Sequence, residues 1–374
     1  MSAVAVFLQQ GTRVDTSPSL LNLFDLLLRD HEVHCFADGF DLRGTPVLPR
    51  SHFKLHSLRG RTSYYRAWMS ARWLHRTGQI GNIICVDPRA FWTCRKFLPS
   101  AKPVFYSFEL YEAADSSSGY TPTVEEETRQ HIRTIRGLII QSEERESIFR
   151  ADYDLPKTTP TLLLPVTYRG PAVGAKLRLL HERYSMPEET RVALHLGAID
   201  SWCWCIELAR TFSKVPGWVL LFHGYARPGY LRDLKSIISV EKIENVVISE
   251  AFHQDLEGFY PLVQSSDLGL AWYENTSPNV RTSGTSSGKI SAYLKFGLPV
   301  VTKRYTGTVR ALESRGCGVC VDTIQDIPQA IKRIEDGYSH YSQNALREFE
   351  RVYRFERYES SILEFLQSAR GPIT

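Results

Sequence analysis

The 374-residue sequence has no apolar run that approaches the ~20 residues needed to cross a bilayer. Its first residues, M-S-A-V-A-V-F-L-Q-Q-G, lack a basic start and a long apolar core, so they predict a first β-strand and not a signal peptide. Cysteines number only seven, and only Cys317 and Cys320 have C-x2-C spacing, with no second pair to complete a zinc site. We therefore expect reduced core thiols and a cytoplasmic protein, with metal or redox chemistry at that pair as the alternative.

The overall composition is ordinary, with 43% hydrophobic and 23% charged residues, which supports packed cores and argues against disorder. The net charge of +4 is unevenly distributed. Residues 43–102 hold twelve Lys or Arg and one acid, Asp87, a local charge of 12 − 1 = +11, interleaved with aromatic residues. This stretch fits an anionic membrane face, a nucleic-acid face, or a solvated basic surface over core aromatics, and no nucleic-acid motif supports the second.

Short apolar runs alternate with helical patterns at least five times in each half of the chain. The strand-like runs fall at residues 3–8, 32–37, 82–86, 103–106, 137–141, 161–165, 192–196, 218–222, 245–248, 268–272, 298–302 and 319–321. Residues 168–175 are rich in Gly and Pro and read as a linker. The pattern predicts an α/β protein of two Rossmann-like parallel-sheet domains, with ligands at the carboxyl ends of the strands.

Residues 284–302, G-T-S-S-G-K-I-S-A-Y-L-K-F-G-L-P-V-V-T, predict a loop, a short helix, a glycine stop and a buried strand. A helix N-terminus carries unpaired N–H groups and about half a positive charge. With serines in front and Lys289 in the first turn, this stretch suits an anion such as phosphate, and an ordinary serine-capped helix is the alternative. The spacing does not match a P-loop.

Polar residues just past two strands of the first half are further site candidates. Gly11 and Asp15 lie in the loop after the first strand, and Glu109 follows the strand at 103–106. A carboxylate there could act as an acid or a base, and Gly11 could let a donor approach the backbone. The alternatives are a turn glycine, a loop aspartate and a capping glutamate.

The second half carries S-S-D-L-G-L-A-W-Y, then S-S-G-K-I-S-A-Y-L-K-F-G-L-P-V-V-T, with F-H-G-Y-A-R-P-G-Y-L-R-D-L upstream. These runs resemble the donor-binding core of glycosyltransferases of the GT-B fold, and most closely the retaining enzymes of family 4. The resemblance implies an N-terminal acceptor domain over 1–172 and a nucleotide-sugar domain over 173–355, facing across a cleft. It also implies that a helix at 356–374 crosses back to the first domain.

Carried over by position, the resemblance implies two groups of donor contacts. The diphosphate would lie near Gly197 and at the helix start, which comprises Ser286, Ser287, Gly288 and Lys289. The nucleoside would lie along residues 223–227 and the loop at 249–253, which include His223, Arg227 and Phe252.

Two departures from the family pattern concern charge. Gly284 and Ala292 stand where the family often has a pair of glutamates, and Ala198 with an uncharged Trp202-Cys203-Trp204 stands where it has Arg and Lys. Other cations are then needed for the diphosphate, and the chain offers Lys289, Arg227 and Arg304. Glu274 is the nearest acid that could replace a lost glutamate. The catalytic candidates are therefore Glu109 and Asp15 from the first half and Glu274 from the second.

The sequence therefore predicts a hexosyltransferase of polysaccharide biosynthesis that moves a sugar from a nucleotide-sugar to a saccharide or lipid-linked acceptor. The resemblance implies retention of configuration. We expect no metal or other cofactor, because a helix terminus and a lysine can stabilise the leaving diphosphate. The stretch at 43–102 would permit peripheral contact with the inner membrane face, and no nucleic-acid partner is expected. The alternatives are an epimerase or phosphorylase of the same fold, and a non-catalytic nucleotide-sugar-binding partner subunit.

Overall fold

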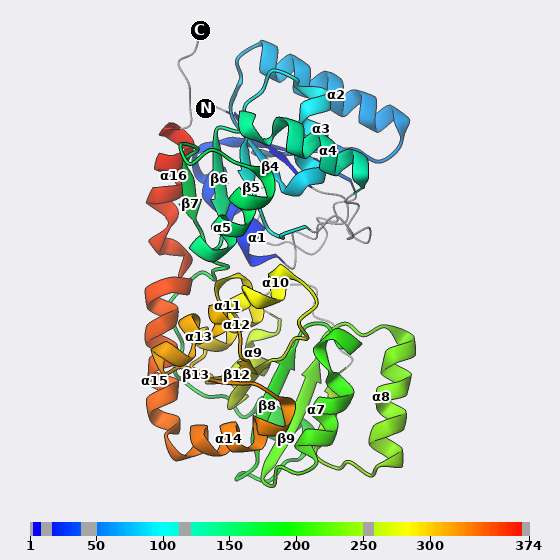
Figure 1. Ribbon diagram of the computed structural model, residues 1–374, viewed down its shortest axis with the longest axis vertical. Helices are drawn as coiled ribbons and strands as arrows, with labels where there is room; N and C mark the ends of the chain where they lie inside the picture. The colour runs from blue at the N-terminus through cyan, green and yellow to red at the C-terminus, as the bar shows by residue number, and fades with distance from the viewer. Residues whose placement is uncertain (1–2, 9–16, 39–50, 112–120, 250–257, 369–374) are drawn as a thin grey trace. The chain divides into compact units, whose positions relative to one another are not determined.

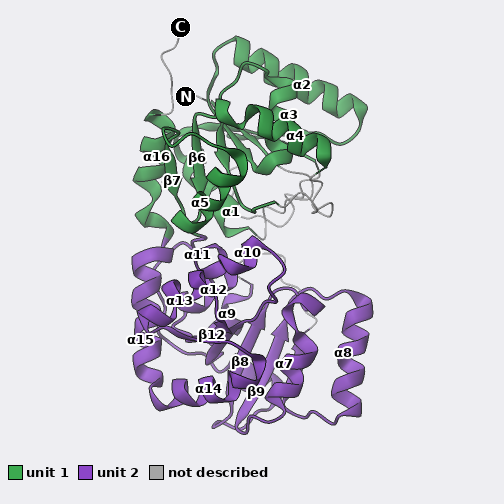
Figure 2. Ribbon diagram, in the orientation of Figure 1, with its two compact units in different colours: residues 1–165, 355–374 green, residues 166–354 purple. Residues whose placement is uncertain are grey.

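The computed structural model describes residues 3–8, 17–38, 51–111, 121–249 and 258–368 (Figure 1). The chain divides into two compact units (Figure 2). Unit 1 comprises Met1–Pro165 and Phe355–Thr374, and unit 2 comprises Val166–Arg354. The division falls after Pro165, before the linker that the Gly/Pro-rich sequence indicated, and residues 166–172 therefore belong to unit 2.

Unit 1 is built on a parallel sheet with the strand order β3-β2-β1-β4-β5-β6-β7. Most of its strands are short apolar runs because helices cover both faces of the sheet. The strands are β1 (Ala3–Phe7), β2 (Glu32–Ala37), β3 (Phe53–Ser57), β4 (Ile80–Val86), β5 (Val104–Tyr106), β6 (Gly137–Ile140) and β7 (Thr161–Leu163).

Two apolar clusters form the core of unit 1. One packs α1 against the chain's last helix and includes Phe24, Leu27, Phe355 and Ile362. The other includes aromatic residues from the strands and from α3 and α5. The helices are α1 (Pro18–Asp30), α2 (Arg61–Arg76), α3 (Asp87–Phe97), α4 (Pro122–His131), α5 (Glu143–Tyr153) and α16 (Glu359–Ser368). Unit 1 therefore needs a segment from the far end of the chain to complete one of its clusters.

The structure adds a strand that the sequence did not indicate. β3 reads F-K-L-H-S and lies at an edge of the sheet, where only Phe53 is buried. A continuous apolar run is therefore not needed in this strand, and the run-based expectation missed it. Helix α3 begins at Asp87, directly after β4.

Unit 2 has a second parallel sheet with the order β10-β9-β8-β11-β12-β13. Its described strands are β8 (Arg191–Leu196), β9 (Trp218–His223), β10 (Val246–Ser249), β11 (Leu268–Ala271), β12 (Val300–Lys303) and β13 (Gly318–Val321). Its described α-helices are α6 (Leu179–Tyr184), α7 (Cys205–Phe212), α8 (Pro228–Val240), α9 (Tyr260–Gln264), α10 (Pro278–Arg281), α11 (Ser283–Ser286), α12 (Gly288–Lys295), α13 (Thr306–Ala311), α14 (Ile327–Asp336) and α15 (Tyr338–Glu348).

All seven cysteines are free and buried, as core thiols are. Among the described residues, no group of three His, Cys, Asp or Glu side chains is arranged to hold a metal ion. Within the same residues, the structure has no helix that is both long and apolar enough to cross a bilayer.

Each sheet has a point where its strand order reverses: between β1 and β4 in unit 1, and between β8 and β11 in unit 2. Sheets of this kind bind ligands outside the carboxyl ends of the strands that flank the reversal. The predicted α/β architecture of two Rossmann-like parallel sheets is thus confirmed, and the two reversal points mark where to look for a site.

Candidate functional site

Helix α12 is pinned to the reversal point of unit 2 by Tyr293. The Tyr293 hydroxyl accepts a hydrogen bond from the Leu196 amide at 2.8 Å and donates one to the Leu194 carbonyl at 2.9 Å. Gly269 in β11 makes room for the ring, since a Cβ there would lie 2.2 Å from it. Because Leu194 and Leu196 lie in β8, these contacts fix the helix across β8 and β11.

Lys289 lies in the first turn of α12 and points to the end of β8. A Cβ on Gly197, the residue after β8, would lie 3.7 Å from the Lys289 Nζ. The Nζ also lies 4.7 Å from the ring centre of Tyr273, near the end of β11. It is buried, and among the described residues it makes no hydrogen bond of ordinary length and angle. Burial lowers the pKa of Lys289, but the neighbouring Tyr273, Cys203 and Cys205 side chains outweigh this effect, so the pKa lies above its usual value. A buried ammonium group without an acceptor is costly, so this position suits an anionic ligand.

The groups around Lys289 do not neutralise it at neutral pH. Burial lowers the pKa of His195 to about 3, with a further contribution from the positive charge of Lys289, so the ring is neutral. The His195 Nε2–H donates to the Ala198 carbonyl at 2.9 Å. Burial likewise raises the pKa of the Cys205 thiol to about 12 and that of the Cys203 thiol above its usual value. The end of β8 is therefore an electropositive place.

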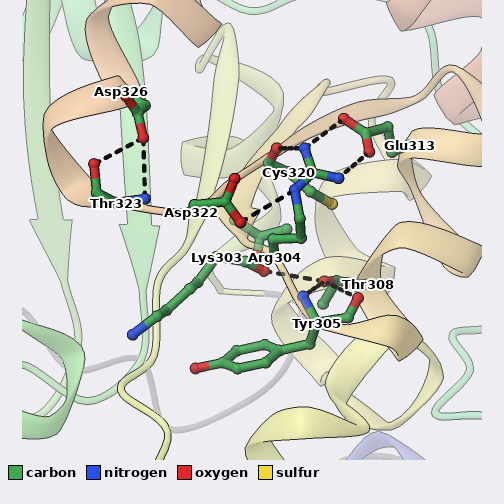
Figure 3. A network of polar contacts seen from close by, with 10 residues as sticks. Lys303, Arg304, Tyr305, Thr308, Glu313, Cys320, Asp322, Thr323 and Asp326 are labelled. Atoms are coloured by element: carbon green, nitrogen blue, oxygen red, sulfur yellow. Dashed lines mark hydrogen bonds and ion pairs between the residues drawn. The ribbon is translucent and has the colours of Figure 1, made fainter.

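The other two candidate cations are paired with carboxylates. Arg227 lies 3.0 Å from the Asp200 carboxylate. Arg304 lies 2.6 Å from Glu313 and 3.4 Å from Asp322, in the network that Figure 3 shows at the ends of β12 and β13. Of the three cations that the sequence offered for a diphosphate, Lys289 alone lacks a carboxylate partner among the described residues.

The serines in front of α12 do not cap it. Ser286 is the last residue of the short helix α11, whereas the sequence indicated a loop here. Its hydroxyl donates to the Thr282 carbonyl at 3.1 Å. The Ser287 hydroxyl lies 3.0 Å from that of Tyr273, and no side chain caps the helix that begins at Gly288. Ser287 stands at the N-cap of α12, but its hydroxyl makes no capping hydrogen bond, so the serine-capped helix that was the ordinary alternative lacks its capping bond.

The ends of β8 and β9 approach each other through two glycines. The Gly197 amide donates to the His223 carbonyl at 2.8 Å, and a Cβ on Gly224 would lie 1.9 Å from the Gly197 carbonyl oxygen. The buried His223 ring lies 3.0 Å from the Ser249 hydroxyl. The backbone at the carboxyl ends of β8 and β9 therefore lies close to Lys289. Phe252, which was expected beside the nucleoside, lies outside the described residues.

Of the two positions of the missing glutamate pair, 284 has no room for a carboxylate and 292 is buried. A Cβ on Gly284 would lie 2.3 Å from the Gly307 carbonyl oxygen, and Ala292 is fully buried. Glu274, the acid considered as a replacement, lies just past β11, and its Oε1 accepts from Lys303 at 3.0 Å. Its Oε2 is buried and has no partner among the described residues.

A second polar cluster lies at the reversal point of unit 1. Asp87 directly follows β4 and has a positive φ of 68°, which is uncommon for a residue with a side chain. Its carboxylate accepts the Phe108 amide at 2.7 Å, the Glu109 amide at 3.3 Å and the Tyr111 hydroxyl at 3.2 Å. Burial raises the pKa of Asp87 to about 7, although the Phe108 hydrogen bond acts in the opposite direction.

The sequence did not indicate Asp87 as a site residue and indicated Glu109 instead. The Glu109 side chain is exposed, and its backbone amide donates a hydrogen bond to the Asp87 carboxylate. The available signal was that Asp87 is the only acid in residues 43–102 and directly ends a strand. Gly11 and Asp15, the other two candidates at this edge, lie outside the described residues.

A family model and solved structures relate this chain to known proteins. Residues 240–363 match the family model of the glucosyltransferase 3-like C-terminal domain, a span that includes α12. No curated protein sequence matches the chain at a significant level.

Solved structures match over nearly the whole chain. Sucrose-phosphate synthase of Thermosynechococcus elongatus has a TM-score of 0.76 at 12% identity, covering 98% of this chain and 99% of that one. HepE of Anabaena in complex with UDP has a TM-score of 0.75 at 15% identity, covering 98% and 100%. WaaG, a glycosyltransferase involved in lipopolysaccharide biosynthesis, has 0.61 at 12% identity, covering 100% and 99%. The chain therefore has the GT-B fold of glycosyltransferases, as the resemblance indicated, while the narrower likeness to family 4 stays a prediction.

Proposed function

We propose that this chain is a glycosyltransferase that uses a nucleotide-sugar donor and holds the donor diphosphate at Lys289. The observation that carries the proposal is the buried Nζ of Lys289, which lacks a hydrogen-bond partner among the described residues and lies at the reversal point of unit 2. The family model over α12 supports it, and the HepE structures contain UDP, UDP with glucose, or UDP-glucose.

In this proposal Lys289 and the first-turn N–H groups of α12 stabilise the charge that develops on the leaving diphosphate. The bond from the anomeric carbon to the diphosphate breaks, and a bond from that carbon to an acceptor hydroxyl forms. The acceptor proton passes to a carboxylate or to the departing phosphate. Loss of one such stabilising group typically costs about 10²–10³ in kcat. Metal independence and retention of configuration are part of the proposal.

Glu109 is the first choice for the group that takes the acceptor proton and Asp15 is the second, with Glu274 as the alternative in unit 2. Asp87 acts as a positioning residue, because it accepts the Glu109 amide and holds the segment that follows β5. The acceptor is a saccharide or a lipid-linked saccharide, as expected of a hexosyltransferase in polysaccharide biosynthesis, and the role of WaaG in lipopolysaccharide biosynthesis is consistent with it.

The first test is a thermal-shift panel with UDP, GDP, ADP, TDP and CMP on the wild type, Lys289→Met and a matched surface control, Lys214→Met. A ligand that binds only the native state raises the melting temperature. We expect one diphosphate to stabilise the wild type and the control, and Lys289→Met to bind it about 100-fold more weakly, as loss of a charge-assisted contact predicts. An equal rise in melting temperature in all three proteins would show that Lys289 does not contact the nucleotide.

A non-catalytic nucleotide-sugar binder is the second candidate, because Gly284 leaves no space for a family glutamate. It predicts donor binding without sugar transfer to any of a series of saccharide acceptors. Conversion of the nucleotide-sugar without an acceptor would identify an epimerase, and phosphorolysis of a disaccharide would identify a phosphorylase.

A further inference from the structure

Helix α2 of unit 1 carries an apolar stripe on its solvent-facing side. Tyr65, Met69 and Trp73 are 60%, 48% and 58% exposed, and their spacing of four residues places them along one face. The opposite face of the helix is the one that packs into unit 1, through Ala67, Ala71 and Leu74. The stripe is therefore not needed for the core, although isolated exposed apolar residues are otherwise common.

Arginines flank this stripe on both sides. At 100° per residue, Arg66 falls beyond Trp73, and Arg61 and Arg72 fall beyond Tyr65, while Arg76 lies within the stripe. Arg61, Arg66 and Arg76 are exposed, and among the described residues none of them pairs with an acid. The Arg72 guanidinium lies 4.8 Å from the ring centre of Trp68.

No acid on this helix offsets these charges. α2 contains no Asp or Glu, and the single acid of the 43–102 stretch, Asp87, is buried at the end of β4. The neighbouring edge strand β3 adds the exposed Leu55 and Lys54, although Lys54 pairs with Glu32 at 2.7 Å. The surface around α2 is thus both cationic and apolar.

A row of apolar side chains flanked by arginines distinguishes the three interpretations of the basic stretch at 43–102, namely a solvated surface, a nucleic-acid face and an anionic membrane face. A merely solvated basic surface explains the arginines but not three large apolar side chains in one row. A single-stranded nucleic acid would stack on aromatic rings, and the centre of the stripe is Met69, which offers no ring. Anionic lipid headgroups satisfy arginines while the apolar side chains enter the headgroup boundary.

We propose that α2 docks unit 1 onto an anionic lipid surface, with Tyr65, Met69 and Trp73 entering the headgroup boundary and the arginines contacting lipid phosphates. This inference goes beyond the proposed transferase activity and does not depend on it, because vesicle binding is measured without any donor or acceptor.

Vesicle flotation tests the surface directly. The wild type should float with phosphatidylglycerol vesicles and not with phosphatidylcholine vesicles. Arg61→Gln/Arg66→Gln/Arg76→Gln should lower the partition coefficient about 100-fold, since each basic residue near such a surface contributes roughly fivefold. Tyr65→Ser/Met69→Ser/Trp73→Ser should also abolish flotation. The control variants Arg232→Gln and Tyr225→Ser/Val240→Ser change exposed residues of unit 2 and should float like the wild type.

A site-specific probe gives a second readout. All seven native cysteines are buried, so a thiol-reactive, polarity-sensitive dye will label Met69→Cys selectively. We expect its emission to shift to the blue with phosphatidylglycerol vesicles, and the same dye on Val240→Cys to remain unchanged. Unchanged emission at position 69, or flotation of both α2 variants at the wild-type level, would overturn the proposal. A dye response to an RNA homopolymer but not to vesicles would overturn it in favour of a nucleic-acid face.

Discussion

Lys289 places an ammonium group inside unit 2, beside the Tyr273 ring and the Gly197 backbone, without a hydrogen-bond partner among the described residues. Burying such a group costs desolvation free energy, and at neutral pH the uncharged Tyr273 ring and thiols beside it supply no counter-charge. A residue of this kind is expected where a ligand supplies the counter-charge.

Lys289→Met should therefore stabilise the ligand-free protein while it weakens nucleotide binding. Methionine retains most of the volume of the lysine stem and removes the charge, so we expect the free energy of unfolding to rise by about 1–3 kcal/mol. Urea titration without ligand measures this change, with Lys214→Met as the control. A loss of stability would mean that the lysine is satisfied within the fold.

Asp87 should make unit 1 less stable at high pH. The folded-state pKa of about 7 lies above that of a free aspartate, so the stabilisation associated with its bound proton is complete at low pH and is lost as pH rises through about 7. The full effect is roughly 4 kcal/mol, at 1.36 kcal/mol for each pKa unit. Asp87→Asn should remove this dependence and be more stable than the wild type at pH 8.

The measurement is denaturant unfolding from pH 4.5 to 8.5, compared between the wild type and Asp87→Asn. Parallel pH curves for the two proteins would contradict the assignment. If Asp87 also positions Glu109, the variant should lower kcat more than it changes the donor KM, and the pH profile of the remaining activity should shift.

At the scale of elements, the position of α12 depends on the contact between Tyr293 and Gly269. Gly269→Ala would place a methyl group 2.2 Å from the ring. We expect it to cost about 2–3 kcal/mol through overpacking and to weaken UDP binding, because α12 must move.

Gly229→Ala in α8 is the matched control, since no atom lies within 4 Å of its Cβ position. It should change stability by no more than about 0.5 kcal/mol, in the favourable direction that helix propensity predicts. Melting temperature and UDP affinity measured together give the result. Normal UDP affinity in a destabilised Gly269→Ala protein would show that α12 does not need this contact to bind donor.

At the scale of the whole molecule, the described residues form separate cores for the two units, and α16 contributes to one of them. Each unit should therefore unfold in its own calorimetric transition. Ile362→Ala should lower the free energy of unfolding of unit 1 alone, by about 2–5 kcal/mol, since Ile362 is fully buried there. The melting temperature of the other transition should not change. UDP should raise only the other transition, and a single transition that responds to both changes would show that the units unfold together.

The sequence by itself determined the alternation of strands and helices, because buried parallel strands must be apolar and their connecting helices amphipathic. It also located α12 and Lys289, since a glycine stop and a following buried strand leave little choice of structure. β3 escaped notice because an edge strand needs only one buried residue, Phe53, to hold it.

The tertiary structure alone decided which charges are free to act. Arg304 and Lys289 look alike in sequence, yet Glu313 and Asp322 pair with the first, whereas the described neighbours of the second include the Tyr273 ring, a neutral His195 and buried thiols. It likewise decided that Asp87 is buried and that Tyr65, Met69 and Trp73 are exposed. Whether a charged side chain is buried or paired depends on neighbours that are distant along the chain. The local sequence does not specify these neighbours, so it does not specify the protonation state or the exposure of the side chain.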